Sequence, residues 1–170
     1  MTTQEKAAAA ARTAAFPPKS ILVPLDFTES SRAGLGAAAR LAGHWSARVR
    51  VVHVDEGPPP SLLQDGEAPA TRAAAELYEA TTRRRLEEAA AECPGASTEL
   101  IEGAPSVEVA RLAAEGAADL VVMGAHGARG LKRFLGGSTA ERALHAAHVP
   151  VLAVQSFPGA SWPRRVLAPV

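Results

Sequence analysis

Short apolar runs alternate with longer amphipathic segments along most of the chain. The apolar runs lie at residues 20–26, 48–54, 98–101, 119–123 and 149–154. Runs of this length, bounded by proline, glycine or acidic residues, are typical of strands with both faces buried. We therefore predict a strand at each run, and Asp26 is expected at the carboxyl end of the first one.

The segments between these runs carry apolar residues at the spacing of helices. Thr28 is placed to cap the first helix, and Pro105 suits the first turn of a later one. A long helix is predicted at about residues 70–91, after a proline-rich loop, and another at about residues 138–147. The positions expected to face the core are Leu35, Ala38, Leu41, Ala42, Ala75, Tyr78, Leu86, Ala89, Ala90, Val109 and Leu112.

Strands that alternate with helices predict an α/β fold, in which right-handed crossovers join the strands of one parallel sheet. Ligands of such sheets bind beyond the carboxyl ends of the strands, where the strand order reverses. The hydrophobic pattern does not by itself set that order. It does divide the chain into a flexible N-terminal tail at residues 1–18, one domain at residues 19–155, and a C-terminal tail at residues 156–170.

The composition limits the classes of binding partner and the cellular compartment that we expect for this protein. Eighteen basic residues balance eighteen acidic ones, so no overall field favours nucleic acid or an anionic membrane. The single cysteine, Cys93, excludes an intramolecular disulfide, fits a reducing compartment and is expected to be structural. Lys6 precedes an alanine run as in a signal peptide, but Arg12 breaks that run, and no segment is long enough to span a membrane. We expect a cytoplasmic protein.

A glycine-rich loop follows the fourth predicted strand. Residues 124–138 read GAHGARGLKRFLGGS, and Ser138 opens the next predicted helix. Glycines let backbone N–H groups approach a ligand closely, and a helix N-terminus adds unpaired donors and the positive end of a dipole. Strand, loop, basic residues and helix start together predict a phosphate-binding site.

Other interpretations of this loop fit less well. Glycine clusters also form ordinary turns, and composition alone does not separate the two structures. The chain has no Gly-Lys-Ser or Gly-Lys-Thr triplet, so the loop is not a Walker A motif. The glycines also lack the GxGxxG spacing of a dinucleotide site and come late in the chain. The spacing of the glycines is therefore the informative feature.

The series Gly124-x2-Gly127-x9-Gly137-Ser138 resembles the nucleotide-binding signature of the universal stress protein family, in its ATP-binding branch. The resemblance covers roughly residues 20–154, including the opening Leu-Val-Pro-Leu-Asp and the final Val-Pro-Val-Leu-Ala-Val. It implies strand order 3-2-1-4-5, ATP with Mg²⁺ or Mn²⁺ at its phosphates, and slow hydrolysis at most. In that order the first and fourth strands are neighbours, so Asp26 and the glycine loop would share one crevice.

The resemblance also implies a set of nucleotide-binding residues. Asp26 would accept a hydrogen bond from a ribose hydroxyl or a base amino group, although the helix dipole also favours an acid at a helix entry. Ser138 and Glu141 form a capping box, on which phosphate binding by Ser138 would be superimposed. Arg129 would pair with phosphates in preference to the other loop cations. The full set is Pro24, Asp26, Val54, Met123, Gly124, Gly127, Arg129, Gly137, Ser138 and Thr139.

The histidines do not form a catalytic or metal-binding group on sequence grounds. His126 lies in the glycine loop without an evident carboxylate to orient it. His145 and His148 share a predicted helix face, but no third ligand stands out. His53 lies in a predicted strand and is expected to be a hydrogen-bonded structural residue.

We therefore expect an ATP-binding regulatory or stress-adaptation module rather than an enzyme. A hydrolase would need a positioned water and charge-stabilising groups, of which only Arg129 and a metal are visible. A partner-binding scaffold without nucleotide is a third interpretation, and the retained glycine signature speaks against it.

A homodimer is expected through the final strand, residues 149–154. That strand carries no charge, and in the implied order it lies at a sheet edge, where its unpaired N–H and C=O groups invite a second copy. Alternatively, the C-terminal tail, with Trp162, would fold back over this edge within a monomer.

Overall fold

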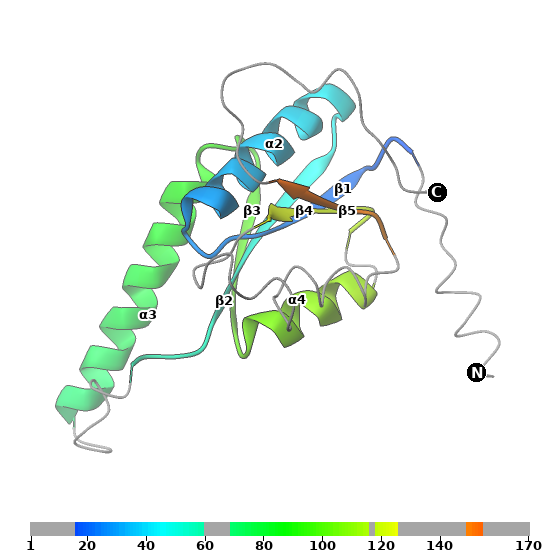
Figure 1. The fold of residues 1–170 in the computed structure, drawn as a ribbon. Helices are drawn as coiled ribbons and strands as arrows, with labels where there is room; N and C mark the ends of the chain where they lie inside the picture. Colours follow the sequence, from blue (N-terminus) through cyan, green and yellow to red (C-terminus); the bar gives the residue numbers. More distant parts are fainter. Residues whose placement is uncertain (1–15, 60–68, 116–117, 126–148, 155–170) are drawn as a thin grey trace, which may run out of the picture.

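A parallel sheet forms the centre of the molecule and carries helices on both faces (Figure 1). The computed structural model describes residues 16–59, 69–115, 118–125 and 149–154. Its strands are β1 (Ser20–Pro24), β2 (Arg48–Asp55), β3 (Ser97–Glu102), β4 (Leu120–Gly124) and β5 (Val151–Val154). They pair in the order β3-β2-β1-β4-β5, and every pairing is parallel. The α/β fold and the expected 3-2-1-4-5 order are therefore confirmed.

The described helices divide between the two faces of the sheet (Figure 1). They are α2 (Glu29–Trp45), α3 (Pro69–Ala90) and α4 (Pro105–Ala114). The helices α2 and α3 cover one face, and α4 covers the other. The predicted helix at residues 138–147 lies outside the described residues.

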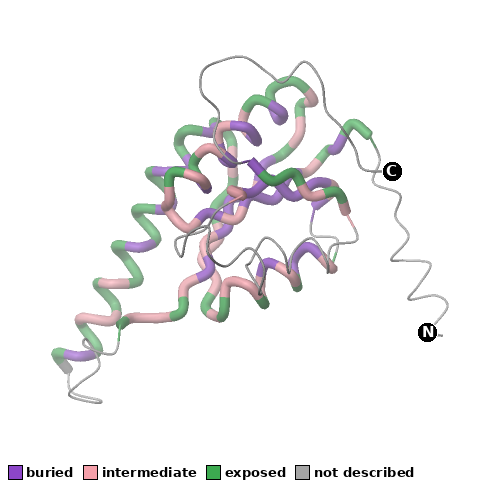
Figure 2. Tube along the Cα trace, in the orientation of Figure 1, coloured by how far each residue is buried: buried purple, intermediate pink, exposed green. Residues whose placement is uncertain are grey.

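Alternation along the strands supplies both faces of the core. In β1, Ile21 and Val23 pack toward α2 and α3, whereas Leu22 packs toward α4. Figure 2 shows buried segments concentrated in the strands, while much of α3 is exposed. All expected core positions of α2 and α4 are buried, but Ala75 and Tyr78 of α3 are only half-buried. Cys93 is buried, as a structural residue should be, and burial raises the pKa of its thiol.

Two strand boundaries differ from the prediction by two residues, the others by at most one, and a proline accounts for each of the two. The first strand was expected to reach Asp26 but ends at Pro24, because a proline has no N–H to continue the ladder. The last strand was expected to begin at residue 149 but begins at Val151. Pro150 precedes it and contributes only its carbonyl, which accepts a hydrogen bond from Val121 N–H at 3.0 Å.

The ladder between β1 and β4 is interrupted at its carboxyl end, and we refer to this interruption as the opening. Pairing between these strands covers only Ile21 with Leu120 and Leu22 with Val121, whereas β1 pairs with β2 as far as Pro24. Leu25 N–H donates to the β2 carbonyl of Val52 at 2.8 Å. Since donors alternate along a strand between its two neighbours, the nitrogen of Pro24 faces β4 and has no hydrogen to offer.

The opposite, amino end of the same strand pair is firmly closed. Asp119 Oδ2 accepts hydrogen bonds from Lys19 N–H, Ser20 N–H and the Ser20 hydroxyl, all within 3.0 Å. Asp119 N–H in turn donates to the Ser20 carbonyl at 3.0 Å. The two strands are therefore tied where they begin, and their pairing stops before their carboxyl ends.

A tyrosine joins α3 to the carboxyl end of β2. The Tyr78 hydroxyl donates to Asp55 Oδ1 at 3.1 Å, and Gly57 N–H donates to the same oxygen at 3.1 Å. Burial raises the pKa of Tyr78 above its ordinary value, and the Asp55 carboxylate raises it further by hydrogen bonding and by charge.

The tyrosine contact predicts a shifted alkaline titration. Tyr78 is the only tyrosine in the chain, so tyrosinate absorbance reports it alone. We expect a midpoint above about 10 in the folded protein and near 10 in denaturant. Because the folded pKa is raised, the linked stability is complete below the unfolded pKa and is lost as pH rises through the folded one. Asp55→Asn should lower the folded midpoint toward the ordinary value; an unchanged midpoint in that variant would show that the contact is not formed.

Candidate functional site

The carboxyl ends of β1 and β4 form the switch point of this sheet. From β1 the chain crosses through α2 and α3 on one face to β2 and β3, and α4 then returns it to β4 on the opposite face. Parallel sheets bind ligands where the crossovers diverge in this way. The opening between β1 and β4 lies at the same point.

Asp26 lies at this opening, two residues beyond β1, and belongs to the start of α2. Its Oδ1 accepts hydrogen bonds from Thr28 N–H at 3.1 Å and from the Thr28 hydroxyl at 2.6 Å. Thr28 is also the N-cap of α2, because its Oγ1 accepts a hydrogen bond from Ser31 N–H at 3.2 Å. Asp26 therefore has the helix-entry role that the sequence allowed, and this contact fixes the orientation of its carboxylate.

Gly124 ends β4 against the first turn of α2. A Cβ on Gly124 would lie 2.6 Å from the carbonyl carbon and 2.8 Å from the carbonyl oxygen of Ser30. A Cβ on Gly34, one turn further along α2, would lie 3.0 Å from Gly124 N. The absence of side chains at both glycines thus lets α2 pack directly on the β4 backbone, a role for Gly124 separate from phosphate approach.

Three further expected site residues lie in the strands next to the opening. Val54 and Met123 are buried in the core on the α4 face, together with Leu22 and Val52. Pro24 is half-buried at the end of β1. The structure therefore brings Pro24, Asp26 and Gly124 to adjoining strand ends. The other expected site residues and the remaining loop and helix residues considered above lie outside the described residues: Gly127, Arg129, Gly137, Ser138, Thr139, Lys132, Arg133, His126, His145 and His148.

The serines at the start of α2 were not singled out from the sequence. Ser31 Oγ accepts Asp26 N–H at 3.3 Å and donates to the Thr28 carbonyl at 3.0 Å. Ser30 Oγ lies 3.5 Å from the carbonyl of Val154, which also accepts Ala125 N–H at 2.7 Å. A run of small polar residues behind an acid, as in Asp-Phe-Thr-Glu-Ser-Ser, is the signal that would have pointed to them.

His53 has the structural role expected of it. Its Nδ1 lies 2.7 Å from the carbonyl oxygen of Leu25, and since a carbonyl only accepts, Nδ1 carries the proton. Within the described ranges, no group of three histidine, cysteine or acidic side chains is placed to hold a metal ion. No helix among the same residues is long and apolar enough to cross a membrane.

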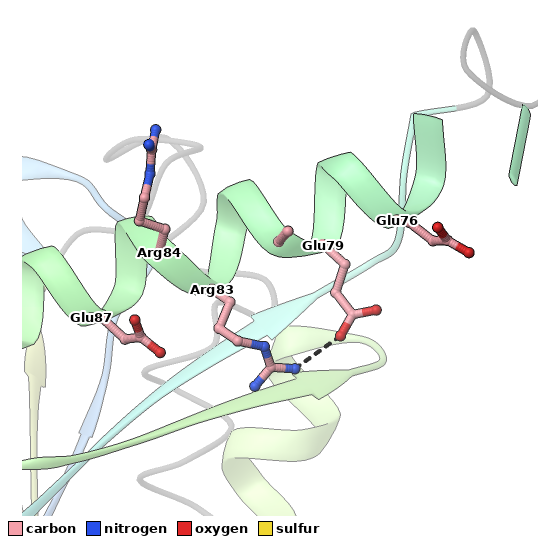
Figure 3. Close-up of a pocket in the computed structure, with 6 residues that line it drawn as sticks. Glu76, Glu79, Arg83, Arg84 and Glu87 are labelled. Carbon is pink, nitrogen blue, oxygen red and sulfur yellow. Dashed lines mark hydrogen bonds and ion pairs between the residues drawn. The ribbon is translucent and has the colours of Figure 1, made fainter. Parts of the chain in front are cut away.

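A hollow of about 350 Å³ lies elsewhere, on the surface of α3 (Figure 3). Its lining residues are Glu76, Glu79, Ala80, Arg83, Arg84 and Glu87. Glu79 and Arg83 pair at 2.9 Å along the helix, while Arg84 points to the other side of it (Figure 3). All of the lining comes from one exposed helix and none from a strand end, so this hollow is not the site at the switch point.

Comparison with known proteins decides the family. The model of the universal stress protein family matches residues 18–155. This chain belongs to that family. A universal stress protein of Methanocaldococcus jannaschii is 34% identical over 142 residues, which cover 81% of this chain and 82% of that protein. A universal stress protein A homolog of Coxiella burnetii is 32% identical over 138 residues, covering 80% of this chain and 95% of the homolog.

Solved universal stress proteins share the fold. One in complex with cAMP has a TM-score of 0.61 and 21% identity, covering 81% of this chain and 97% of its own. Another, from Archaeoglobus fulgidus in complex with dAMP, has a TM-score of 0.51 and 21% identity, covering 80% and 97%. The arrangement of strands and helices is therefore shared with these two structures.

The packing of α2 on β4 predicts opposite effects for two glycine substitutions. Gly124→Ala would press a methyl group against the Ser30 backbone and should destabilise the fold by about 1–3 kcal/mol. Gly36→Ala is the matched control, because its Cβ would meet nothing within 4 Å and alanine favours a helix, so it should stabilise by about 0.4–1 kcal/mol. Urea unfolding measures both. Equal free energies of unfolding for the two variants would contradict the close approach of α2 to β4.

Proposed function

We propose that this universal stress protein binds ATP at the switch point and acts as a regulatory or stress-adaptation module in the cytoplasm. The observation that carries the proposal is that Asp26 and Gly124, at the ends of adjoining strands, both lie against the start of α2, Asp26 at Thr28 and Gly124 at Ser30. Gly124 is also the first residue of the glycine-rich series that matches the family's nucleotide-binding signature.

The adenosine end of the nucleotide is assigned to the β1 side of the opening. Asp26 has one carboxylate oxygen held by Thr28, so the orientation of the group is set before a ligand arrives. A preoriented carboxylate suits a ribose hydroxyl or a base amino group, both of which donate hydrogen bonds. Pro24 is half-buried at the end of β1 and would offer apolar surface to a purine, whereas Val54 and Met123 are buried in the core on the α4 face.

The phosphate end is assigned to the glycine loop, on the basis of its sequence. Gly127, Gly137, Ser138 and Thr139 would offer backbone N–H groups, and Arg129 would offer a charge. Mg²⁺ or Mn²⁺ would be held chiefly by the phosphates, as hard cations commonly are in nucleotide sites. The complexes of two family members with cAMP and dAMP support an adenine nucleotide as the ligand class.

Calorimetric titration with ATP and Mg²⁺, and separately with adenosine, tests both ends of the site. Asp26→Ala should weaken the binding of both ligands by roughly 1.5–3 kcal/mol, the contribution of a hydrogen bond to a charged group. Gly127→Val should weaken ATP binding through steric exclusion of the phosphates but leave adenosine binding unchanged. Asp26→Asn retains an acceptor for Thr28 and therefore separates loss of charge from loss of the α2 entry turn.

ATP binding and phosphate release by the wild-type protein distinguish the proposed function from a scaffold and from a hydrolase. Absence of ATP binding at millimolar nucleotide would favour a partner-binding scaffold over the proposed function. Sustained phosphate release near one per second, the lower part of the ordinary enzyme range of about 1–10³ per second, would favour a hydrolase.

We further propose that the protein is a homodimer joined through β5. This strand ends the described order of the sheet, and Leu152 and Ala153 are exposed on it. The carbonyl of Pro150 accepts a hydrogen bond from Val121 of β4, and that of Val154 accepts one from Ala125, directly after β4. By alternation, the N–H groups of Val151 and Ala153 face away from β4, where a second copy would meet them.

Ala153→Pro should convert the dimer to a folded monomer. The substitution removes an outward N–H without touching the bonds between β5 and β4, so the fold should survive. Light scattering should give about twice the 17.5 kDa chain mass for the wild type and about that mass for the variant. Ala153→Ser, which keeps the donor, is the matched control and should remain dimeric. A wild-type monomer at tens of micromolar would instead favour an edge covered by residues 156–170.

A further inference from the structure

Phe27, the residue directly after Asp26, has a backbone conformation that side chains disfavour. Its φ is +62°, in the left-handed region that glycine adopts freely and that costs an L-residue roughly 1–2 kcal/mol. At this residue the chain leaves β1 and turns into the first turn of α2. The bend also brings Thr28 back to the Asp26 carboxylate. The orientation of Asp26 thus depends on a strained bend.

Two side chains from other elements hold the Phe27 ring. The His53 ring, on β2, lies 4.4 Å from it between centroids at an interplanar angle of 47°. The guanidinium of Arg85, on α3, lies over the Phe27 ring, 4.3 Å from its centroid. Both distances are within the range of attractive ring–ring and cation–π contacts.

His53 is itself fixed to the strand that carries the bend. Its Nδ1–H donates to the carbonyl of Leu25, two residues before Phe27. The ring contact and the hydrogen bond therefore hold both sides of Asp26 to β2. Arg85 adds the only one of these contacts that comes from a helix.

We propose that Arg85 and His53 are positioning residues for the nucleotide site. By holding Phe27 in the left-handed conformation they keep Asp26 and Thr28 in the geometry that receives the adenosine, without touching the ligand. This inference rests on the proposed function, since it names the residues on which the orientation of Asp26 depends. Helix α3 is thereby coupled to nucleotide affinity through one aromatic ring.

Glycine at position 27 provides the decisive test, because it takes a positive φ without the cost of a side chain. Arg85→Gln in the full chain should weaken ATP binding about two- to fivefold by calorimetry, the effect of a lost exposed cation–π contact. In a Phe27→Gly background the same Arg85→Gln change should have no further effect on affinity. Phe27→Ala retains the unfavourable positive φ but removes the ring that Arg85 and His53 contact. This variant should therefore bind ATP more weakly than Phe27→Gly.

Arg84→Gln is the matched control. Arg84 neighbours Arg85 on α3, has the same charge and makes an exposed ion pair with Glu88 at 3.6 Å, with no ring contact among the described residues. It should leave the dissociation constant for ATP as in the wild type. If Arg85→Gln has the same affinity for ATP as Arg84→Gln while the wild type binds ATP, the positioning role of Arg85 is overturned and the proposed function stands. An equal loss from Arg85→Gln in both backgrounds would also overturn it, since Arg85 would then act without Phe27. Wild-type protein that binds no ATP would overturn the proposed function itself.

Discussion

The proline at position 24, which has no backbone N–H, limits the pairing between β1 and its neighbour β4 in the sheet. Its nitrogen faces β4 and cannot donate, so the central strand pairs fully with β2 but only partly with β4. Asp119 ties the other end of the same strand pair, so the interruption of the ladder is confined to the carboxyl end. The crossovers diverge there as well. A single proline in the central strand thus interrupts the ladder at the switch point of the sheet.

The elements around this opening are held in two ways, by a close backbone approach and by a few side-chain contacts. Helix α2 packs on β4 through glycines, and its first turn is capped by Thr28 and closed by Asp26. Helix α3 contributes from further away, with Tyr78 on Asp55 and Arg85 on Phe27. Both contacts are made to residues at the carboxyl ends of β1 and β2, so α3, the longest described helix, packs against the strand ends beside the candidate site.

Periodicity predicted the architecture well because the core follows it closely. The strand runs and the inner faces of α2 and α4 were readable from local pattern. Strand order came from the family resemblance, and the strand ends were wrong where proline interrupted the ladder. The role of Gly124 against Ser30 and the stack of Arg85 on Phe27 join residues far apart in the chain, so no local pattern contains them. The phosphate side of the site, residues 126–148, remains a prediction from sequence.

The central position of β1 also orders events during synthesis. Its first partner, β2, follows after a single helix, but the bond between Ser20 and Asp119 spans 99 residues of chain. The segment from β1 to β3 is therefore complete on the ribosome before β4 has been made. Until β4 arrives, one edge of β1 is bare, flanked by the apolar side chains that later become the core. A chain interrupted before residue 119 would present that edge to any neighbouring strand, and such edges promote aggregation.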